Sequence, residues 1–232
     1  MRFLGRVAAV LEKILPERVF WRIHGFVVAF ATPVRFGHVS GHFRSSIVHR
    51  PMDNQGRPSP WMTYPVINFL EGKDLKDKRI LEWGAGQSTM WWAARAREVV
   101  SFEADQTWFK FVSGRIPSNV KLGLVDERLN KVPPDLLNDK FDIVVVDGLD
   151  RVAAARISVD MLAEDGALIM DDSEQPWSPQ GYPILDFMRE RGFQRIDFFG
   201  HAPAVIRRHC TSVFIKQRCF LLAGTEIPRQ YD

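Results

Sequence analysis

Short apolar runs alternate with stretches of helical periodicity along the chain from residue 61 onward. The apolar runs are Arg79–Trp83, Val99–Glu103, Val120–Val125, Phe141–Asp147 and Ala167–Asp171. The helical stretches are Tyr64–Leu70, Thr89–Ala96, Thr107–Ile116 and Ala153–Leu162. Strands that alternate with helices predict a parallel sheet covered on both faces. The uninterrupted apolar run Ile143–Val146 is typical of a central strand of such a sheet.

The end of the chain follows a different pattern. After a predicted helix near Ile184–Arg191, the segments Phe193–Phe199 and Ser212–Leu222 predict two strands that a loop connects, with no helix between them. Strands joined without a crossover helix pair in antiparallel fashion. The sequence therefore predicts an α/β fold with a Rossmann-like doubly wound sheet. This sheet is mostly parallel with an antiparallel C-terminal strand, and an N-terminal helical extension precedes it.

The pattern divides the chain into an N-terminal extension, residues 1–58, and a main domain, residues 59–232. The extension begins with a predicted helix that Pro16 ends, and a second apolar segment, Val19–Ala31, ends before Pro33. We expect these helices to pack on the main domain. The alternative is peripheral membrane contact through residues 1–31, because basic amphipathic helices also lie on bilayers.

Residues 35–60 are rich in Gly, Ser, Pro, His and Arg. This composition predicts a loop or a short hairpin with its turn at residues 53–56. Its histidines, His38, His42 and His49, are expected to be loop residues and not metal ligands.

Composition excludes several classes of function. Hydrophobic residues make up 46% of the chain and charged residues 25%, as in a globular domain, and the net charge of +3 lacks the clustered excess that nucleic-acid binding requires. Two cysteines without a CxxC pair predict neither a zinc site nor a redox dithiol. Charged residues before the apolar segment Val19–Ala31 argue against a signal peptide. A cytoplasmic location is therefore expected, with membrane association if the extension binds a bilayer.

Two glycines follow the first predicted strand in Glu82-Trp83-Gly84-Ala85-Gly86-Gln87-Ser88-Thr89. Gly84 and Gly86 allow the backbone to turn and approach a ligand, and Ser88 or Thr89 opens the next helix. A nicotinamide enzyme needs a third glycine where Thr89 stands. An acid at Glu82 attracts a cationic ligand such as a sulfonium and repels a diphosphate. The residues thus favour a sulfonium cofactor, and an NAD(P)-dependent oxidoreductase is the alternative.

Other acids stand where the predicted strands end. Glu103 is placed to accept hydrogen bonds from ribose hydroxyls, and Asp126 from an adenine amino group. Asp147 ends the fourth strand, where cofactor and substrate meet. Asp171 and Asp172 end the fifth strand. We expect no metal there, and the alternative is Mg²⁺ held by Asp147, Asp171 and Asp172.

The ordered motifs resemble those of bacterial class I S-adenosylmethionine-dependent methyltransferases of largely unassigned substrate. The resemblance covers roughly residues 40–216. Its motifs are matched by Glu82, Gly84, Gly86, Ser88 and Thr89; by Glu103, Asp105 and Trp108; by Asp147, Gly148 and Arg151; by Asp171, Asp172 and Ser173; and by Gly200, Pro203, Thr211, Ser212 and Phe214. The resemblance implies the fold and S-adenosyl-L-methionine, and it names no acceptor. Many metal-dependent O-methyltransferases carry Asn where this chain has Asp172.

Methyl transfer requires that donor and acceptor be held in line, and a hydroxyl acceptor must also lose its proton. Asp147 and His201 are the candidate bases. Trp61, Tyr64 and Asp172 are candidate contacts of the acceptor, which we expect to be a hydroxyl of a small molecule or glycan. A non-catalytic cofactor-binding module docked to a membrane or a partner is a further alternative.

Overall fold

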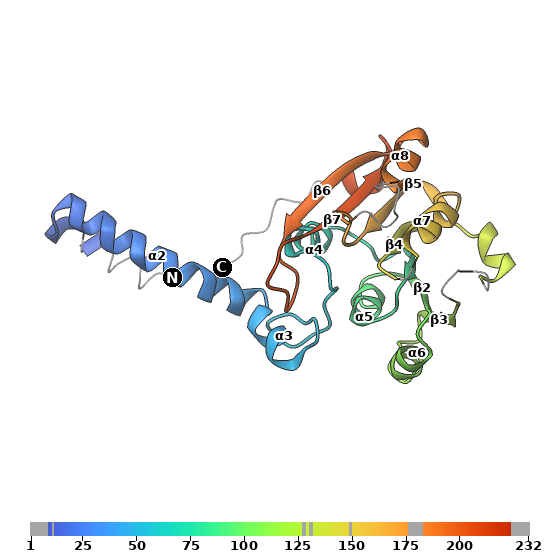
Figure 1. Cartoon of the computed structure of the whole chain (residues 1–232), viewed down its shortest axis with the longest axis horizontal. Helices are drawn as coiled ribbons and strands as arrows, with labels where there is room; N and C mark the ends of the chain where they lie inside the picture. Colours follow the sequence, from blue (N-terminus) through green and yellow to red (C-terminus); the bar gives the residue numbers. More distant parts are fainter. Residues whose placement is uncertain are drawn as a thin grey trace.

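A seven-stranded sheet forms the centre of the computed structural model (Figure 1). The structure describes residues 9–10, 12–126, 129, 132–148, 150–175 and 183–223. The strand order is β3-β2-β1-β4-β5-β7-β6. The strands are β1 Arg79–Trp83, β2 Glu98–Glu103, β3 Val120–Leu124, β4 Phe141–Val146, β5 Leu162–Met170, β6 Gln194–Gly200 and β7 His209–Ile215. The predicted Rossmann-like fold is confirmed.

The strand pairing is parallel from β3 to β5 and antiparallel around β7. Ile80 of β1 lies opposite Ile143 of β4 and Val99 of β2. β7 pairs antiparallel with β5 and β6, so Met170 lies opposite Ser212. The carboxyl ends of β1, β2, β4 and β5 and the amino end of β7 therefore share one edge of the sheet. The strand order switches between β1 and β4, with β2 and β3 on one side and β5 on the other, and ligands bind at such a switch point in open α/β sheets.

Helices cover both faces of the sheet. The helices that the structure describes are α2 Glu17–Val39, α3 His42–Val48, α4 Tyr64–Glu71, α5 Gln87–Ala93, α6 Gln106–Ser113, α7 Arg151–Val159 and α8 Pro183–Glu190, with 3-10 turns η1 Pro134–Asn138 and η2 Phe220–Leu222. Ile80 and Ile143 face the cluster that includes α4 and α5, whereas Leu81 and Val144 face α7 and α8. Successive residues of a strand point to opposite faces, so every central strand is apolar on both sides.

The element boundaries differ from the predictions in residues 35–60 and at the end of the last strand. Residues 35–60 are not all loop, because α2 continues to Val39 and α3 follows, so His38 and His42 are helical. The predicted turn is present, with Gly56 at φ +85° and its N–H bonded to the Asp53 carbonyl oxygen. The last strand ends at Ile215 because the polar turn at residues 216–218 interrupts it before η2.

Helix α2 runs past Pro33 and projects away from the sheet (Figure 1). Pro33 lacks an N–H, and the carbonyl of the exposed Ala29 can bond to solvent instead. Of the residues in α2, only Phe20 and Gly37 are buried. The expectation that this segment packs on the main domain is therefore wrong for most of α2. The first predicted helix falls largely outside the described residues. Within those residues, no helix combines the length and apolarity that crossing a bilayer requires.

Removing the hydroxyl of Ser158 should destabilise the fold. The buried Trp83 indole donates its N–H to Ser158 Oγ at 2.7 Å, which ties β1 to α7. Ser158→Ala leaves that buried donor unpaired, and we expect the free energy of unfolding to fall by about 1–3 kcal/mol in urea denaturation. Ser113→Ala removes only a hydroxyl bonded to its own helix, at the Phe109 carbonyl. Equal losses in the two variants would contradict this role for Ser158.

Candidate functional site

A cavity of about 630 Å³ lies at the carboxyl ends of β1, β2 and β4. Its volume lies within the range of small-molecule sites in proteins, roughly 300–1,000 Å³. The loop after β1, the segments after β2 and β4, helix α6 and the chain before α4 line it. The lining residues are Val48, His49, Arg50, Pro51, Trp61, Gly84, Ala85, Gly86, Gln87, Ser88, Glu103, Asp105, Trp108, Phe111, Asp147, Gly148 and Arg151. Five predicted cofactor residues and Trp61 thus meet in one cavity.

Gly84 makes the turn that starts the cavity floor. Its φ is +104°, and a Cβ there would lie 2.7 Å from the Asp147 carbonyl oxygen. Only glycine combines this backbone conformation with so close an approach of two chain segments. Gly86 differs, because a Cβ added there would meet no atom within 4 Å. The space beside Gly86 is therefore open cavity and not packed protein.

A buried hydrogen-bond chain fixes the shape of this loop. The Gly86 N–H donates to Thr89 Oγ1 at 2.9 Å, and Thr89 Oγ1–H donates to Glu82 Oε2 at 2.5 Å. Ser101 of β2 also donates to Glu82 Oε2, at 2.7 Å. One N–H of this bend, that of Gly86, is therefore already bonded within the protein.

Glu82 lies behind the loop and does not line the cavity. Its side chain is fully buried, and its Oε1 accepts no hydrogen bond from the described part of the chain. Burial raises the pKa of Glu82, whereas bonds from Ser101, Ser88 and Thr89 oppose that rise. Glu82, predicted as a direct contact of a cationic ligand, thus has no surface on the cavity. Its carboxyl group positions the loop from beneath through the bonds to Thr89 and Ser101.

The second wall of the cavity follows β2. Glu103 Oε1 accepts the N–H groups of Ala104 and Asp105, both at 2.8 Å, which fixes the carboxylate at the strand end. The Trp108 indole donates its N–H to the Ala85 carbonyl oxygen at 2.7 Å and stacks on Phe111 at 5.0 Å between ring centroids. A fixed carboxylate beside a flat aromatic wall is a surface that suits a nucleoside.

The third wall comes from the segment at residues 48–51 and from Trp61. That residues 48–51 line the cavity was not predicted from the sequence. Arg50 lies 5.9 Å from the Phe111 ring centroid, so this segment reaches the wall that α6 provides. His49 caps α3 in the left-handed conformation, at φ +50°. Trp61 is half-exposed at the rim of the cavity, where it could contact an acceptor.

Asp147 shares the guanidinium of Arg151 with Asp172. Arg151 Nη2 lies 3.1 Å from Asp147 Oδ1 and 3.3 Å from Asp172 Oδ2. Burial raises the pKa of Asp147 to about 7, with Arg151 opposing the rise and the charges of Asp172 and Glu82 adding to it. A carboxyl with this pKa exchanges a proton near neutral pH, which suits a general base.

The three acids predicted as the alternative metal site do not form one. Asp171 is buried and accepts the Thr211 hydroxyl at 2.5 Å, whereas Asp147 and Asp172 bond to Arg151. The positive φ of Asp172, +51°, turns consecutive acids in different directions. Among the described residues, a different trio, Asp172, Glu174 and His209, brings its ligand atoms within 4.8 Å of one another.

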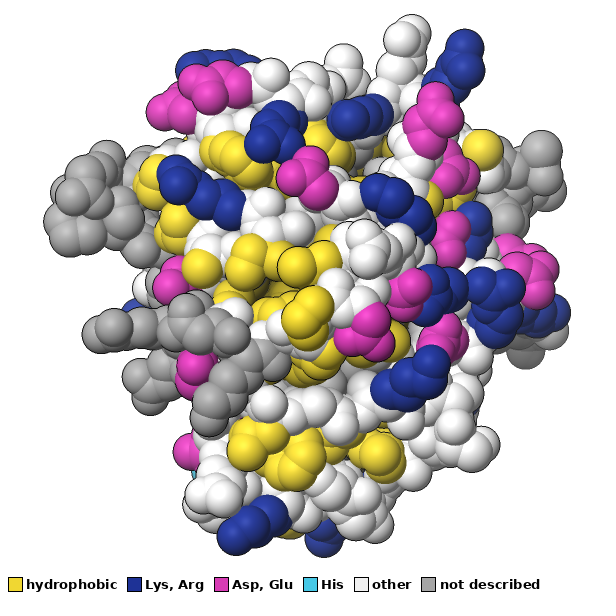
Figure 2. Space-filling view, turned by 90° about the vertical axis from the view of Figure 1, so that its right-hand side faces the viewer, with side chains coloured by type: hydrophobic (Ala, Val, Ile, Leu, Met, Phe, Trp, Pro, Cys, Tyr) yellow, Lys and Arg dark blue, Asp and Glu magenta, His cyan; other side chains and the backbone are white. Residues whose placement is uncertain are grey.

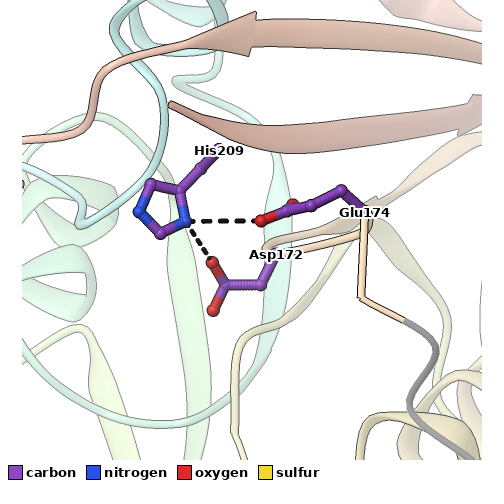
Figure 3. Close-up of side chains that lie close together, drawn as sticks. All are labelled: Asp172, Glu174 and His209. Atoms are coloured by element: carbon purple, nitrogen blue, oxygen red, sulfur yellow. Dashed lines mark hydrogen bonds and ion pairs between the residues drawn. The ribbon is translucent and has the colours of Figure 1, made fainter. Parts of the chain in front are cut away.

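Figure 3 shows that His209 Nδ1 points at both carboxylates of this trio. It lies 2.8 Å from Asp172 Oδ1 and 3.5 Å from Glu174 Oε1. Glu174 also accepts the Cys210 N–H at 2.9 Å. His209 begins β7 and the acids follow β5, so these bonds join the ends of two antiparallel strands. Through Asp172 and Arg151 the trio connects to Asp147, and hydrogen bonds account for its arrangement.

Several other predicted residues lie outside the lining of the main cavity. Tyr64 lines a second cavity of about 680 Å³ beside α2, its hydroxyl lies 3.4 Å from His42 Nδ1, and burial raises its pKa to about 12. The His201 ring lies 6.5 Å from that of Phe36, near the same helix. Asp126 follows β3 without lining the main cavity. The geometry therefore favours Asp147 over His201 as the base.

Comparisons with known proteins support the fold. No family model matches the sequence, and no curated protein matches it as a relative. A candidate caffeoyl-CoA O-methyltransferase from Staphylococcus aureus has a TM-score of 0.51 and 13% identity, covering 75% of this chain and 88% of its own. Precorrin-6y C5,15-methyltransferase from Geobacter metallireducens has a TM-score of 0.50 and 12% identity, covering 66% and 87%. At such identity the likeness shows that this chain has a class I methyltransferase fold.

The raised pKa values make stability depend on pH. The folded state keeps protons on Asp147 and Asp171 that the unfolded chain releases near the usual value of 3.8. The free energy of unfolding should therefore fall as pH rises from about 4 to about 7. Asp147→Asn should flatten that slope in urea denaturation at a series of pH values. Asp186→Asn, on an exposed face of α8, is the control and should leave it unchanged. A slope that is identical in both variants would contradict the raised pKa of Asp147.

Proposed function

We propose that this protein is an S-adenosylmethionine-dependent methyltransferase. The observation that carries the proposal is the closed hydrogen-bond chain from Gly86 through Thr89 to Glu82 beneath a glycine floor. It engages one backbone N–H of the bend, that of Gly86, and places the Glu82 carboxyl group under the loop. Both features favour a cationic ligand over a dinucleotide, because diphosphates bind where helix N-terminal N–H groups are available.

The lining of the cavity suits the parts of the proposed cofactor. Glu103 is held by two backbone N–H groups and would accept the ribose hydroxyls. Trp108 offers its ring to the adenine. The open space beside Gly86 would take the methionine portion, whose ammonium and sulfonium would gain from the ionised fraction of Asp147 in the same cavity. The solved structures of similar fold carry methyltransferase names, which agrees with this choice.

The finer proposal is O-methylation of a hydroxyl on a small molecule or glycan. S-adenosylmethionine, when bound, supplies an electrophilic methyl group on sulfur. The task of the protein is to hold the acceptor oxygen in line with that group, which can lower the activation free energy by several kcal/mol. Asp147 removes the hydroxyl proton, and its pKa of about 7 leaves a large fraction ionised at neutral pH. Arg151 orients the Asp147 carboxylate by a bond to Oδ1. Trp61 bounds the acceptor side.

Cofactor identity is tested by thermal denaturation with S-adenosylhomocysteine and with NADH. A ligand at 100 times its Kd stabilises the folded state by roughly 2.7 kcal/mol. We expect the melting temperature to rise with the concentration of S-adenosylhomocysteine and not with that of NADH. The reverse result would establish the oxidoreductase alternative and overturn the proposal.

Gly86→Leu should separate binding from folding. A Cβ at residue 86 would meet no atom within 4 Å, so the fold should tolerate a larger residue, but its side chain would enter the space proposed for the methionine portion. We expect affinity for S-adenosylhomocysteine to fall at least about tenfold in calorimetric titration, with little change in the melting temperature of the free protein. Gly114→Leu, also in open space but outside the cavity, is the control. Unchanged affinity in Gly86→Leu would contradict the placement.

Asp147→Asn should remove the base while keeping the shape of the site. In an assay of S-adenosylhomocysteine release across hydroxylated acceptors, the rate of the unmodified protein should rise with pH through about 7. The variant should be about 100-fold slower or more, without that rise. Cofactor binding without turnover on any acceptor would favour a non-catalytic module. Equal turnover in the variant would eliminate Asp147 as the base.

A further inference from the structure

Helix α2 carries a continuous apolar face that no other described element covers. Val19, Ile23, Phe26, Phe30 and Val34 follow one another at spacings of four, three, four and four residues, which places them along one side of the helix. Phe26, Phe30 and Val34 are 66%, 62% and 60% exposed. Figure 1 shows the helix projecting from the domain. A continuous row of large exposed apolar side chains marks a surface that binds another protein or a membrane.

The other sides of α2 carry positive charge near both ends. Arg18 and Arg22 lie in the first part of the helix, and Arg35 lies near its end. Between residues 23 and 34 the helix has no Asp, Glu, Lys or Arg. Trp21, half-exposed, stands beside the arginines. An apolar face that carries large aromatic residues, with tryptophan and arginines on the neighbouring sides, is typical of helices that lie in a membrane interface.

The charge of the whole chain is divided unevenly. Residues 1–50 contain eight Lys and Arg against two Asp and Glu, a net charge of +6, so residues 51–232 carry −3 of the total of +3. The face of the protein opposite to α2 mixes both signs with small apolar areas (Figure 2). The positive excess is thus on the segment that holds the apolar face, which matches a negatively charged surface.

We infer that α2 docks this protein on an anionic membrane. The helix lies in the plane of the bilayer, with Phe26 and Phe30 in the acyl boundary and Arg18, Arg22 and Arg35 at the headgroups. The arginines suit this place because their long side chains reach headgroup phosphates from a helix buried at the interface. A second copy of this chain would explain the apolar face but not the accompanying positive charge, since like charges would then meet.

Vesicle flotation of the full chain tests the inference. We expect it to float with vesicles of phosphatidylcholine containing about 30% phosphatidylglycerol, more weakly with phosphatidylcholine alone, and less at about 0.5 M salt. The double variant Phe26→Ser and Phe30→Ser should lower partitioning at least about tenfold. Arg18→Glu with Arg22→Glu should remove the preference for anionic vesicles. Leu137→Ser is the control, because Leu137 is a similarly exposed apolar residue on η1, away from α2.

Three results would overturn the inference. They are absence of flotation in the unmodified protein, equal flotation of the phenylalanine double variant, and a dimer in light scattering that this double variant dissociates without any vesicle binding. If the double variant still binds S-adenosylhomocysteine, its loss of vesicle binding is independent of cofactor binding. A failure of the membrane inference can then be distinguished from a failure of the proposed function.

Discussion

The buried carboxylate of Glu82 organises the site. Glu82 ends a strand in the middle of the sheet, and its Oε2 accepts hydroxyls from the neighbouring strand and from the helix that follows. Placing a carboxylate in an apolar interior is costly unless hydrogen bonds compensate. Here the compensating groups, Thr89 and Ser101, are also the ones that fix the turn. The same bonds that make Glu82 tolerable therefore give the cavity floor its shape.

A second polar network stands beside the first. Arg151 joins Asp147 to Asp172, and Asp172 joins His209 on β7. The antiparallel strand at the end of the chain is thus linked to the strand that carries the proposed base. Because Arg151 is shared, it offsets only part of the burial of Asp147, which leaves that carboxyl with a pKa near neutrality. Burial raises the pKa of this acid, and the shared pairing with Arg151 limits the rise.

Sequence periodicity predicted the sheet and its strand ends well, because a strand that is buried on both faces consists almost entirely of apolar residues. Gly84, Gly86, Ser88, Glu103 and Asp147 could be placed in one cavity since parallel strands end at a common edge. The direction of Glu82 could not be predicted, because strand position alone does not say which neighbour donates to it. The position of His201 and Tyr64 outside the lining of the main cavity could not be predicted, because the path of α2 brings other groups beside them. Arg50 and His209 act through contacts between distant segments, which local patterns do not encode.

The wall at residues 48–51 changes how the chain can be divided. The composition of the sequence suggested a boundary at residue 58, yet Arg50 and Pro51 lie before it and line the cavity. A fragment starting at residue 59 would keep every strand of the sheet and lose one side of its binding chamber. The complete sheet therefore needs fewer residues of this chain than the complete cavity does. A fragment that starts at residue 59 would bind the proposed cofactor more weakly than the full chain, even if it folds.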